Sequence, residues 1–364
     1  MKEMPNKVLL QKYLAGKASP LEREAVARWY TELQYDSTVT SYEEVQETVW
    51  QNILIQTKSK KKVRTLYMKY AAAIVLALVS LAVIFFQLQE TTTPPISAQQ
   101  VRPGSNKAVL YLDQDSVVLS DLDSGEVKIL KYAQVTKLGD GTIAYQTLAN
   151  VAPGTWTKLS TPTGGQFKIL LSDGSTVMLN AASTLEFPNV FASDIRTVKL
   201  DGEAFFEVSH NPEKPFIVES KNQKTKVLGT KFNISSYADS KTTTSLVEGK
   251  IEVSTANQRI VLRPGEQTIN DGNQLTHLKA LSKADTDWKD GHLSFDSKPL
   301  GEIMQSVAKW YDITVFFEEP ELMAKTFTGS VPRNKPLDEI LQALTLTGEV
   351  HFHLKDRKLT VTAN

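Results

Sequence analysis

The amino-acid sequence predicts a multidomain protein with a small all-α domain, one transmembrane helix, an all-β domain and a C-terminal α+β domain. Three observations predict this fold class: an unbroken apolar segment, an apolar–polar alternation with a period of two from about residue 101 to 277, and a motif that occurs twice near the C-terminus. At 364 residues the chain is long enough for two or three domains, each with its own core. The predicted parts are residues 1–57 (helical domain), 58–69 (basic segment), 70–88 (transmembrane helix), 89–160 (linker and N-terminal β extension), 161–280 (β domain) and 285–364 (α+β repeat domain).

The composition excludes several classes of site. Lysine plus arginine and aspartate plus glutamate both number 41, so no overall charge favours nucleic-acid binding. The chain has no cysteine, which excludes disulfides, thiolate metal sites and a cysteine nucleophile. No serine–histidine–aspartate arrangement, HExxH motif or pair of catalytic acids stands out. We therefore predict no cofactor, no metal site and no turnover enzyme.

Residues 1–57 are predicted to form three short helices. The first ends at Gly16, a residue that suits a left-handed cap, and the second begins at the capping box Ser19-Pro20-Leu21-Glu22. A second capping box at residues 41–44 precedes a third apolar stripe at residues 45–54. The apolar residues that we predict to bind a partner protein are Leu14, Leu21, Trp29 and Leu33.

Three interpretations of this helical domain remain open, because three short helices bury little surface by themselves. It could be a self-contained bundle with Trp29 and Trp50 in its core, a clamp that completes its core on a partner, or a DNA-binding helix-turn-helix. Acidic residues slightly outnumber basic residues in this part of the chain. This balance argues against phosphate binding and favours a basic protein partner.

Residues Tyr70–Leu88 are predicted to cross a membrane. This segment contains no charged residue, and nineteen helical residues extend ~28 Å, close to the hydrocarbon thickness of a bilayer. A buried core helix is the alternative, but such helices rarely lack a polar face over this length. A secretory signal peptide does not fit, because residues 1–69 precede the apolar segment.

The charges that flank this segment predict its orientation. Glu90 is the only charged residue after it until Arg102, whereas a group of basic residues precedes it without an acid. Because positive charge stays in the cytoplasm, we predict a single-pass protein of the bacterial inner membrane with a cytoplasmic N-terminus and a periplasmic C-terminus. The basic run could also bind nucleic acid, but its position beside an apolar span favours lipid headgroups. The basic residues are Lys58, Lys60, Lys61, Lys62, Arg64 and Lys69.

The region from about residue 101 to 277 is predicted to be a β-sandwich. Its clearest hairpin joins strands at Phe167–Leu171 and Thr176–Leu179 through a turn that contains Asp173-Gly174. Short strands with turn signals continue at a spacing typical of a sandwich. The other predicted strands are Val109–Leu112, Val117–Leu119, Phe216–Glu219, Lys226–Ile234, Thr242–Val247, Lys250–Val253 and Ile260–Leu262.

The C-terminal region contains an internal repeat. Lys298–Gln305 recurs 37 residues later as Lys335–Gln342 with six of eight residues identical, and residues 312–317 match residues 349–354 at the same offset. Each copy is predicted to be a helix that starts at a proline and is followed by an alternating strand, which gives a βαβ–βαβ domain with pseudo-twofold symmetry. His351 and His353 share a strand face, but two histidines without a third ligand more often belong to a solvated face than to a metal site.

Four motifs in the β region make the chain resemble the FecR family. They follow in the family's order and spacing over about 100 residues, although each alone is a weak indication. Tyr13–Gly16 also resembles the family's cytoplasmic domain, and the C-terminal repeat resembles the STN module of signalling TonB-dependent receptors. The motifs are Gly164–Gln166 with Leu171–Ser183, Leu200–Val208 with Lys214–Phe216, Val227–Asn233, and Leu246–Gly249.

The resemblance implies a function as an anti-sigma factor. Residues 1–57 would bind an ECF-type sigma factor, and the periplasmic part would respond to the signalling domain of a TonB-dependent outer-membrane receptor. The alternative that we retain is a membrane-anchored DNA-binding transcription regulator with a periplasmic sensor domain. A steep salt dependence of binding to duplex DNA would favour that alternative.

The resemblance also implies a self-cleavage site, because some members of the family cut themselves at a Gly-Thr bond in the motif matched by Val227–Phe232. The Thr230 hydroxyl would attack the Gly229 carbonyl, the amide would become an ester, and water would hydrolyse the ester. The two halves would stay together if the strands on either side of the cut pair in one sheet. The alternative is that Gly229 forms a bulge and Thr230 is only a β-forming residue.

Overall fold

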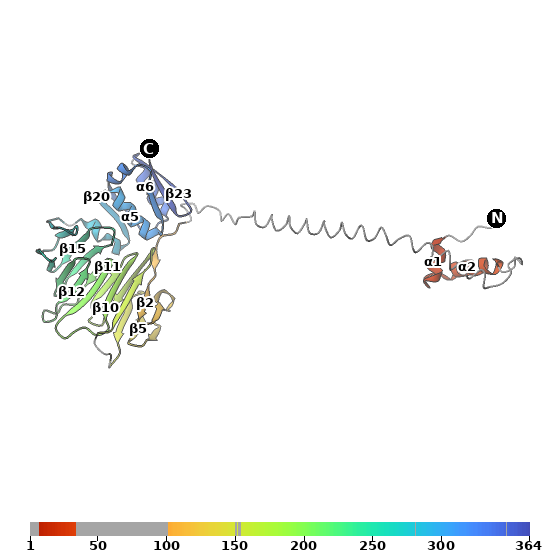
Figure 1. Cartoon of the computed structure of the whole chain (residues 1–364), viewed down its shortest axis with the longest axis horizontal. Helices are drawn as coiled ribbons and strands as arrows, with labels where there is room; N and C mark the ends of the chain where they lie inside the picture. Colours follow the sequence, from red (N-terminus) through yellow and green to blue (C-terminus); the bar gives the residue numbers. More distant parts are fainter. Residues whose placement is uncertain (1–6, 34–100, 150, 152–153, 281, 347) are drawn as a thin grey trace. The chain divides into compact units, whose positions relative to one another are not determined.

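The structure, a computed structural model, describes residues 7–33, 101–149, 151, 154–280, 282–346 and 348–364 (Figure 1). The predicted transmembrane helix at 70–88, the basic segment at 58–69 and the third helical stripe at 45–54 lie outside these residues. Within the described ranges, no helix is both long and apolar enough to cross a membrane. The chain divides into two compact units, residues 1–92 and 93–364.

The first unit contains helices α1 (Lys7–Leu14) and α2 (Pro20–Leu33). The capping box is confirmed, because the Ser19 amide donates to Glu22 Oε2 at 2.8 Å and the Glu22 amide donates to Ser19 Oγ at 3.4 Å. The first of these bonds lowers the pKa of Glu22. Gly16 has the predicted left-handed conformation, with φ of 70°, at the end of α1.

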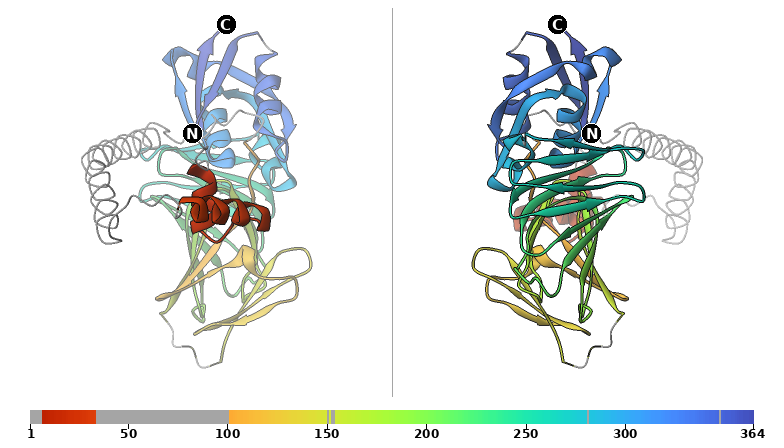
Figure 2. Two further views of the ribbon diagram at one scale, coloured as in Figure 1. Left: turned by 90° about the vertical axis from the view of Figure 1, so that its right-hand side faces the viewer. Right: turned by 90° about the vertical axis from the view of Figure 1, so that its left-hand side faces the viewer.

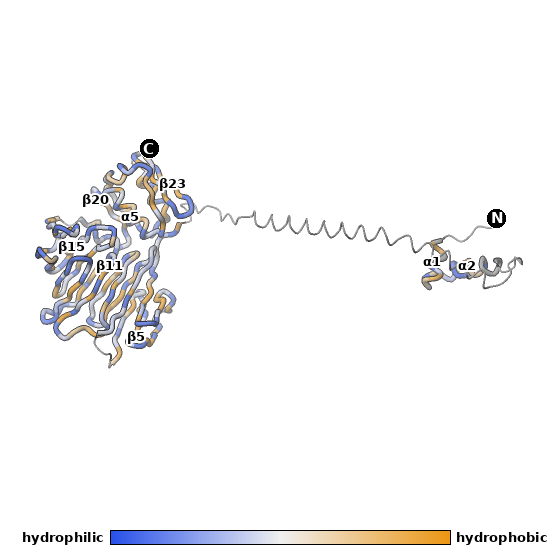
Figure 3. Tube along the Cα trace, viewed as in Figure 1, coloured by the Kyte–Doolittle hydropathy of each residue, from blue (hydrophilic) through white to orange (hydrophobic). Residues whose placement is uncertain are grey.

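The larger part of the second unit is all β, as predicted for the β region. Figure 3 shows the alternation of apolar and polar residues along its strands. The strands are β1 (Ser105–Asn106), β2 (Val109–Leu112), β3 (Asp115–Val118), β4 (Val127–Ile129), β5 (Ala133–Lys137), β6 (Ile143–Thr147), β7 (Trp156–Thr161), β8 (Gly165–Leu170), β9 (Thr176–Leu179), β10 (Ser183–Pro188), β11 (Arg196–Glu207), β12 (Phe216–Ser220), β13 (Gln223–Val227), β14 (Lys231–Ser236), β15 (Thr242–Glu248), β16 (Ile251–Ser254), β17 (Arg259–Leu262), β18 (Gln267–Asn270) and β19 (Leu275–Leu278).

All of these strands except β1, which pairs in parallel with β8, form two sheets around one core. The first sheet has the order β3-β2-β7-β10-β11-β12-β13-β16-β17, with β11 and β12 parallel. The second has the order β4-β5-β6-β8-β9-β11-β14-β15-β18-β19, with β6 and β8 parallel. A single cluster of buried apolar side chains includes residues from both sheets, so the core lies between them.

Strand β11 belongs to both sheets. Residues 196–201 pair in the first sheet and residues 202–207 pair in the second. The change occurs at Gly202, where φ is 102° and an added Cβ would lie 2.6 Å from Ser183 Cα. Only glycine combines this backbone conformation with so close an approach.

The predicted strand at Lys226–Ile234 is wrong as a single element. The chain leaves the first sheet at the end of β13 and enters the second sheet at the start of β14. Residues 228–230, which we call the junction, connect the two sheets. The predicted hairpin is confirmed: β8 and β9 pair, the Leu171 amide donates to the Ser175 carbonyl at 2.8 Å, and Gly174 has φ of 82°.

The C-terminal part contains the predicted order of strand, helix and strand in both repeats (Figure 1). The helices begin directly after Pro299 and Pro336, which are their N-cap residues. The elements are β20 (His292–Pro299), α5 (Leu300–Tyr311), β21 (Thr314–Phe317), β22 (Thr326–Pro332), α6 (Leu337–Thr345), β23 (Val350–Lys355) and β24 (Lys358–Ala363). Short 3₁₀ helices flank them at η3 (Lys283–Asp285), η4 (Asp287–Asp290) and η5 (Pro320–Ala324).

The expectation of two βαβ units is corrected by the pairing. Strands β20 and β22 form one antiparallel sheet, and β21, β24 and β23 form another, so the two strands of each repeat lie in different sheets. Strand β24, which has no counterpart in the first repeat, lies between β21 and β23 and breaks the pseudo-twofold symmetry. Figure 2 shows this part beside the strands of the sandwich.

The sandwich core predicts a large effect for Phe206→Ala. Phe206 is fully buried, and its ring stacks on Phe232 with 4.9 Å between centroids. We expect a loss of about 3–5 kcal/mol in the free energy of unfolding, because the cavity adds to the lost transfer energy. Urea unfolding of residues 101–364, followed by circular dichroism, measures this loss. Phe316→Ala is the control, since Phe316 is half exposed, and equal losses in both variants would contradict the assigned core.

Candidate functional site

The first candidate site is the apolar surface of the helical unit. Leu14 is the last residue of α1 and is 83% exposed, and Leu21 is the second residue of α2 and is 81% exposed. Both residues lie beside the loop that joins the two helices, where Lys12 and Glu22 form an ion pair at 3.4 Å. Trp29 and Leu33 are placed in α2, but their side chains lie outside the described part of the structure. Two of the four predicted residues therefore provide exposed apolar surface on a small polar unit.

The second candidate site is the junction at residues 228–230. Thr230 is 4% exposed, and its hydroxyl donates to the Lys250 carbonyl at 3.2 Å. The loop at residues 208–215 holds both sides of Gly229. The Val208 amide donates to the Thr230 carbonyl at 3.0 Å, and the Asn211 amide donates to the Leu228 carbonyl at 2.7 Å.

Close packing explains why the junction requires glycine. A Cβ on Gly229 would lie 2.6 Å from both Cα and Nδ1 of His210. On the other side, a Cβ on Gly249 would lie 2.8 Å from Thr230 Oγ1 and 2.9 Å from the Gly229 carbonyl oxygen. Gly249 has φ of 99°, which also favours glycine. The Thr230 hydroxyl and the Gly229 carbonyl thus approach the same residue.

A buried ion pair holds the loop that packs on the junction. Arg196 is 2% exposed and donates from Nη1 to Asp173 Oδ2 at 2.7 Å. The same guanidinium donates to the carbonyls of Ser209 at 2.9 Å and Lys214 at 2.8 Å. Asp173 also accepts bonds from the amide and the hydroxyl of Ser175. Such a pair is tolerated in a core only when further hydrogen bonds compensate its desolvation, as they do here.

The strands on either side of the Gly229–Thr230 bond do not pair with each other, so that expectation is corrected. Strand β13 pairs with β12 and β16 in the first sheet, whereas β14 pairs with β11 and β15 in the second. Each strand nevertheless pairs with a strand from the other side of the bond: β13 with β16, and β14 with β11. The sheets would therefore hold the two halves together after a cut.

The third candidate site is a cleft of about 950 Å³ between the sandwich and the C-terminal part. One wall is formed by Ser235, Thr243 and Ile269 on β14, β15 and β18, and the other by β20 and the start of α5. Sequence reasoning did not identify this cleft, because its walls are far apart in the chain.

A buried polar network lines part of the cleft. The Glu203 carboxylate accepts hydrogen bonds from the side-chain amides of Asn180 at 2.8 Å and Asn233 at 2.9 Å. The oxygens of the two amides accept bonds from the C-terminal half of the chain: Asn233 from Trp288 Nε1 at 3.1 Å, and Asn180 from Arg333 at 2.9 Å. Glu203 on strand β11 is thus connected to the C-terminal part of the chain by hydrogen bonds through two asparagines. Asn233 links it to Trp288, and Asn180 links it to Arg333.

Arg333 is the central cation of this network. It is 3% exposed, and its guanidinium lies 3.5 Å from the centroid of the Trp310 ring. It donates to the Trp288 carbonyl at 3.0 Å, and its own carbonyl accepts from Trp310 Nε1 at 2.7 Å. Burial lowers the pKa of Arg333 to about 10, so the group stays charged at neutral pH.

Sequence reasoning missed Glu203, Trp288 and Arg333 as a group. Glu203 interrupts the apolar motif Leu200–Val208, and Asn180 and Asn233 also occur within quoted motifs. Carboxylate and amide side chains at strand positions are disfavoured unless they are satisfied, so these three residues could have been recognised as a buried network. Nothing in the sequence indicates that Arg333 completes it.

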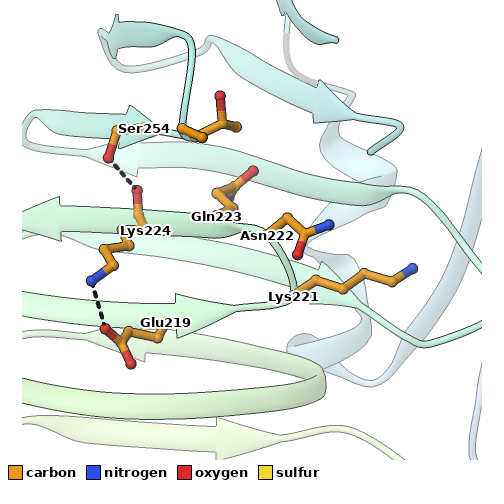
Figure 4. A pocket seen from close by; sticks show the side chains of 8 residues that line it. Glu219, Lys221, Asn222, Gln223, Lys224 and Ser254 are labelled. Atoms are coloured by element: carbon orange, nitrogen blue, oxygen red, sulfur yellow. Dashed lines mark hydrogen bonds and ion pairs between the residues drawn. The ribbon is translucent and has the colours of Figure 1, made fainter. Parts of the chain in front are cut away.

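Two further features, a surface groove and a pair of histidines, offer fewer functional groups. Figure 4 shows a groove of about 420 Å³ where Lys224 and Glu219 form a surface ion pair at 2.9 Å and Ser254 donates to the Lys224 carbonyl. His351 and His353 are exposed on one face of β23, as predicted, and His351 contacts Asn364. Across the described residues, no group of three side chains could hold a metal ion.

Comparisons with known proteins match two regions of the chain. The family described as FecR protein matches residues 157–252, and the family described as FecR, C-terminal, matches residues 292–361. Two crystal structures of a putative anti-sigma factor from Parabacteroides distasonis ATCC 8503, at 1.65 and 2.50 Å resolution, are similar to this chain with a TM-score of 0.54 each. Their sequences are 28% and 29% identical to it, and the similarity covers 57% of this chain and 99% of theirs. No curated protein matches the sequence.

Asp285 in the cleft predicts a pH dependence of stability. Burial raises the pKa of Asp285 to about 6; Lys298 opposes this rise, and the nearby carboxylates, led by Glu203, increase it. Because the folded state binds this proton more tightly than the unfolded state, stability falls as the pH rises from about 4 to about 6. Asp285→Asn should remove this loss and stabilise residues 101–364 by about 2–3 kcal/mol at neutral pH.

Thermal unfolding at several pH values measures this effect. The difference in thermal stability between Asp285→Asn and the unaltered fragment should grow from about pH 4 to about pH 6 and then stay constant at higher pH. Asp115→Asn is the matched control, since Asp115 is exposed on β3. A difference that does not change with pH would contradict the assignment.

Proposed function

The chain belongs to the FecR family, and we propose that it is an inner-membrane anti-sigma factor that relays a periplasmic signal to an ECF-type sigma factor in the cytoplasm. The single observation that carries this proposal is the match of both FecR regions in one chain whose fold resembles that of a putative anti-sigma factor. The apolar segment at 70–88 and its basic flank support a single membrane crossing between the helices at residues 7–33 and the β region that begins at about residue 101.

The helical unit is the part that we assign to the sigma factor. Its exposed Leu14 and Leu21 supply apolar contact area, and the slight excess of acidic residues suits a basic partner. Trp29 and Leu33 continue the same apolar stripe in the sequence. Contacts of this kind give affinity through a few buried apolar side chains, with charges that steer the encounter.

The C-terminal part is the part that we assign to a TonB-dependent outer-membrane receptor, in the role of an STN-like module. Among the described strands, β20 and β22 pair only with each other, so each has one edge without a strand partner. Unpaired edges accept strands from other proteins. A receptor signalling domain that offers an extended strand would fit this sheet.

Self-cleavage at Gly229–Thr230 is a further element of the proposal. The Thr230 oxygen attacks the Gly229 carbonyl carbon, the C–N bond breaks, and the released amine takes the proton; water then hydrolyses the ester to a Gly229 carboxylate and a free Thr230 hydroxyl. The closeness of His210 and Gly249 to this bond supports the proposal, because a rigid surrounding can hold a bond in an activated geometry. The reaction occurs once per chain and is not turnover.

The double variant Leu14→Ala/Leu21→Ala tests the sigma-factor interface. We expect at least about a tenfold loss of affinity, since two exposed apolar contacts are removed without disturbing a core. The full chain is solubilised in detergent, the bound proteins are identified by mass spectrometry, and the affinity for the recovered sigma factor is measured. Lys17→Ala is the control, and circular dichroism verifies folding. Undiminished affinity would place the interface elsewhere, and binding of duplex DNA with a steep salt dependence would favour a DNA-binding regulator instead.

Thr230→Ala and Thr230→Ser test the self-cleavage. Mass spectrometry of purified residues 101–364 should find a fragment that begins at residue 230 in the unaltered chain and in Thr230→Ser, but not in Thr230→Ala. Thr276→Ala is the control, because Thr276 is an exposed threonine on β19. If the unaltered chain remains intact after prolonged incubation, the cleavage proposal is wrong, and the anti-sigma function stands independently of it.

A further inference from the structure

The first residues described after the predicted membrane segment pack into the C-terminal part. Val101 is fully buried, and it belongs to the core cluster of the C-terminal part instead of the sandwich core. Its carbonyl accepts a hydrogen bond from the Leu337 amide at the start of α6, at 3.3 Å. Residues that follow the predicted membrane segment are thus held by helices more than 200 residues later in the chain.

Gly104 continues this contact. A Cβ on Gly104 would lie 2.6 Å from two ring carbons of Trp310 on α5 and 2.9 Å from the Gly164 carbonyl oxygen. The next residue, Ser105, donates its amide to that same carbonyl at 2.9 Å, and the Gly164 amide donates to the Lys309 carbonyl at 2.7 Å. Residues 101–104, which we call the exit segment, therefore run between the C-terminal helices and the Gly164 turn of the sandwich.

The buried network described above also holds Trp310 in place. Arg333 stacks on this ring, accepts a hydrogen bond from it, and reaches across to Asn180 in the sandwich. On the exposed side, Thr163 donates to Asp312 at 2.6 Å. Releasing the exit segment therefore requires that Trp310 moves and that the buried Arg333 loses partners, which is unfavourable for a charge in a core.

We propose that the C-terminal part is a clamp that holds the exit segment in place. Trp310 packs against the segment, and Arg333 holds the Trp310 ring in position. While the C-terminal part is docked on the sandwich, Val101 is buried and Gly104 lies against Trp310. Its undocking frees the chain where it leaves the predicted membrane span. A partner that binds the undocked C-terminal part more tightly would shift the population toward the released state. This inference goes beyond the sigma-factor proposal, because the clamp is defined by contacts within residues 101–364.

Cysteine accessibility tests the clamp, since the chain contains no native cysteine. Val101→Cys, Lys107→Cys and Leu110→Cys are made separately in the full chain in detergent, and their labelling by a maleimide is timed. Lys107 is exposed and reports free labelling, whereas Leu110 is fully buried in the sandwich and reports its integrity. Each cysteine is then combined with Gly104→Ala, which forces the Trp310 ring away. Gly329→Ala is the matched control, because nothing lies within 4 Å of a Cβ there.

We expect Val101→Cys to label at least about tenfold more slowly than Lys107→Cys, and Gly104→Ala to remove most of this difference while Leu110→Cys stays protected. Gly329→Ala should change neither rate. Hydrogen exchange of residues 101–106 without any cysteine gives the same comparison if Val101→Cys itself loosens the contact. The proposal is overturned if residue 101 exchanges or labels freely in the unaltered chain. It is equally overturned if Gly104→Ala leaves residue 101 protected, or if it exposes residue 110 to the same extent.

Discussion

Strand β11 is the element on which the rest of residues 101–364 depends, because one continuous strand belongs to both sheets. Its first residue, Arg196, is the buried cation that holds the loop against the junction. Gly202 allows the change of sheet, and Glu203 immediately after it anchors the buried network of the cleft. Residues 202–207 then pair with β14, which begins directly after Thr230. The junction, the cleft and the docking of the C-terminal part are therefore fixed relative to one strand.

Two buried arginines perform different tasks in this arrangement. Arg196 has a carboxylate partner at 2.7 Å and two carbonyl acceptors, so its charge is locally compensated. Arg333 has no carboxylate in contact among the described residues; it depends on carbonyl and amide oxygens and on the Trp310 ring. Since a charge without a carboxylate in contact is costly to bury, Arg333 depends on keeping these contacts.

The sequence correctly predicted the elements whose formation depends on residues close together in the chain. The capping box at Ser19–Glu22, the hairpin around Gly174 and the order of elements in the C-terminal repeat were all predictable, because each depends on residues close in sequence. The break within Lys226–Ile234 was not, since the alternation of apolar residues continues through it while the chain changes sheets. The splitting of each repeat between two sheets was missed because it depends on where β24 inserts. The cleft was missed because Arg333 and Asn180 meet only in the folded chain.

We propose that the helical unit and residues 101–364 lie on opposite sides of one membrane, since a signal relay across a membrane requires this topology. Single cysteines at Lys17 and Lys107, both exposed in the structure, can be labelled with a membrane-impermeant maleimide in intact bacterial spheroplasts. We predict that residue 107 is labelled at once and residue 17 only after the membrane is permeabilised. Labelling of residue 17 in intact spheroplasts, or equal labelling of both residues, would contradict it.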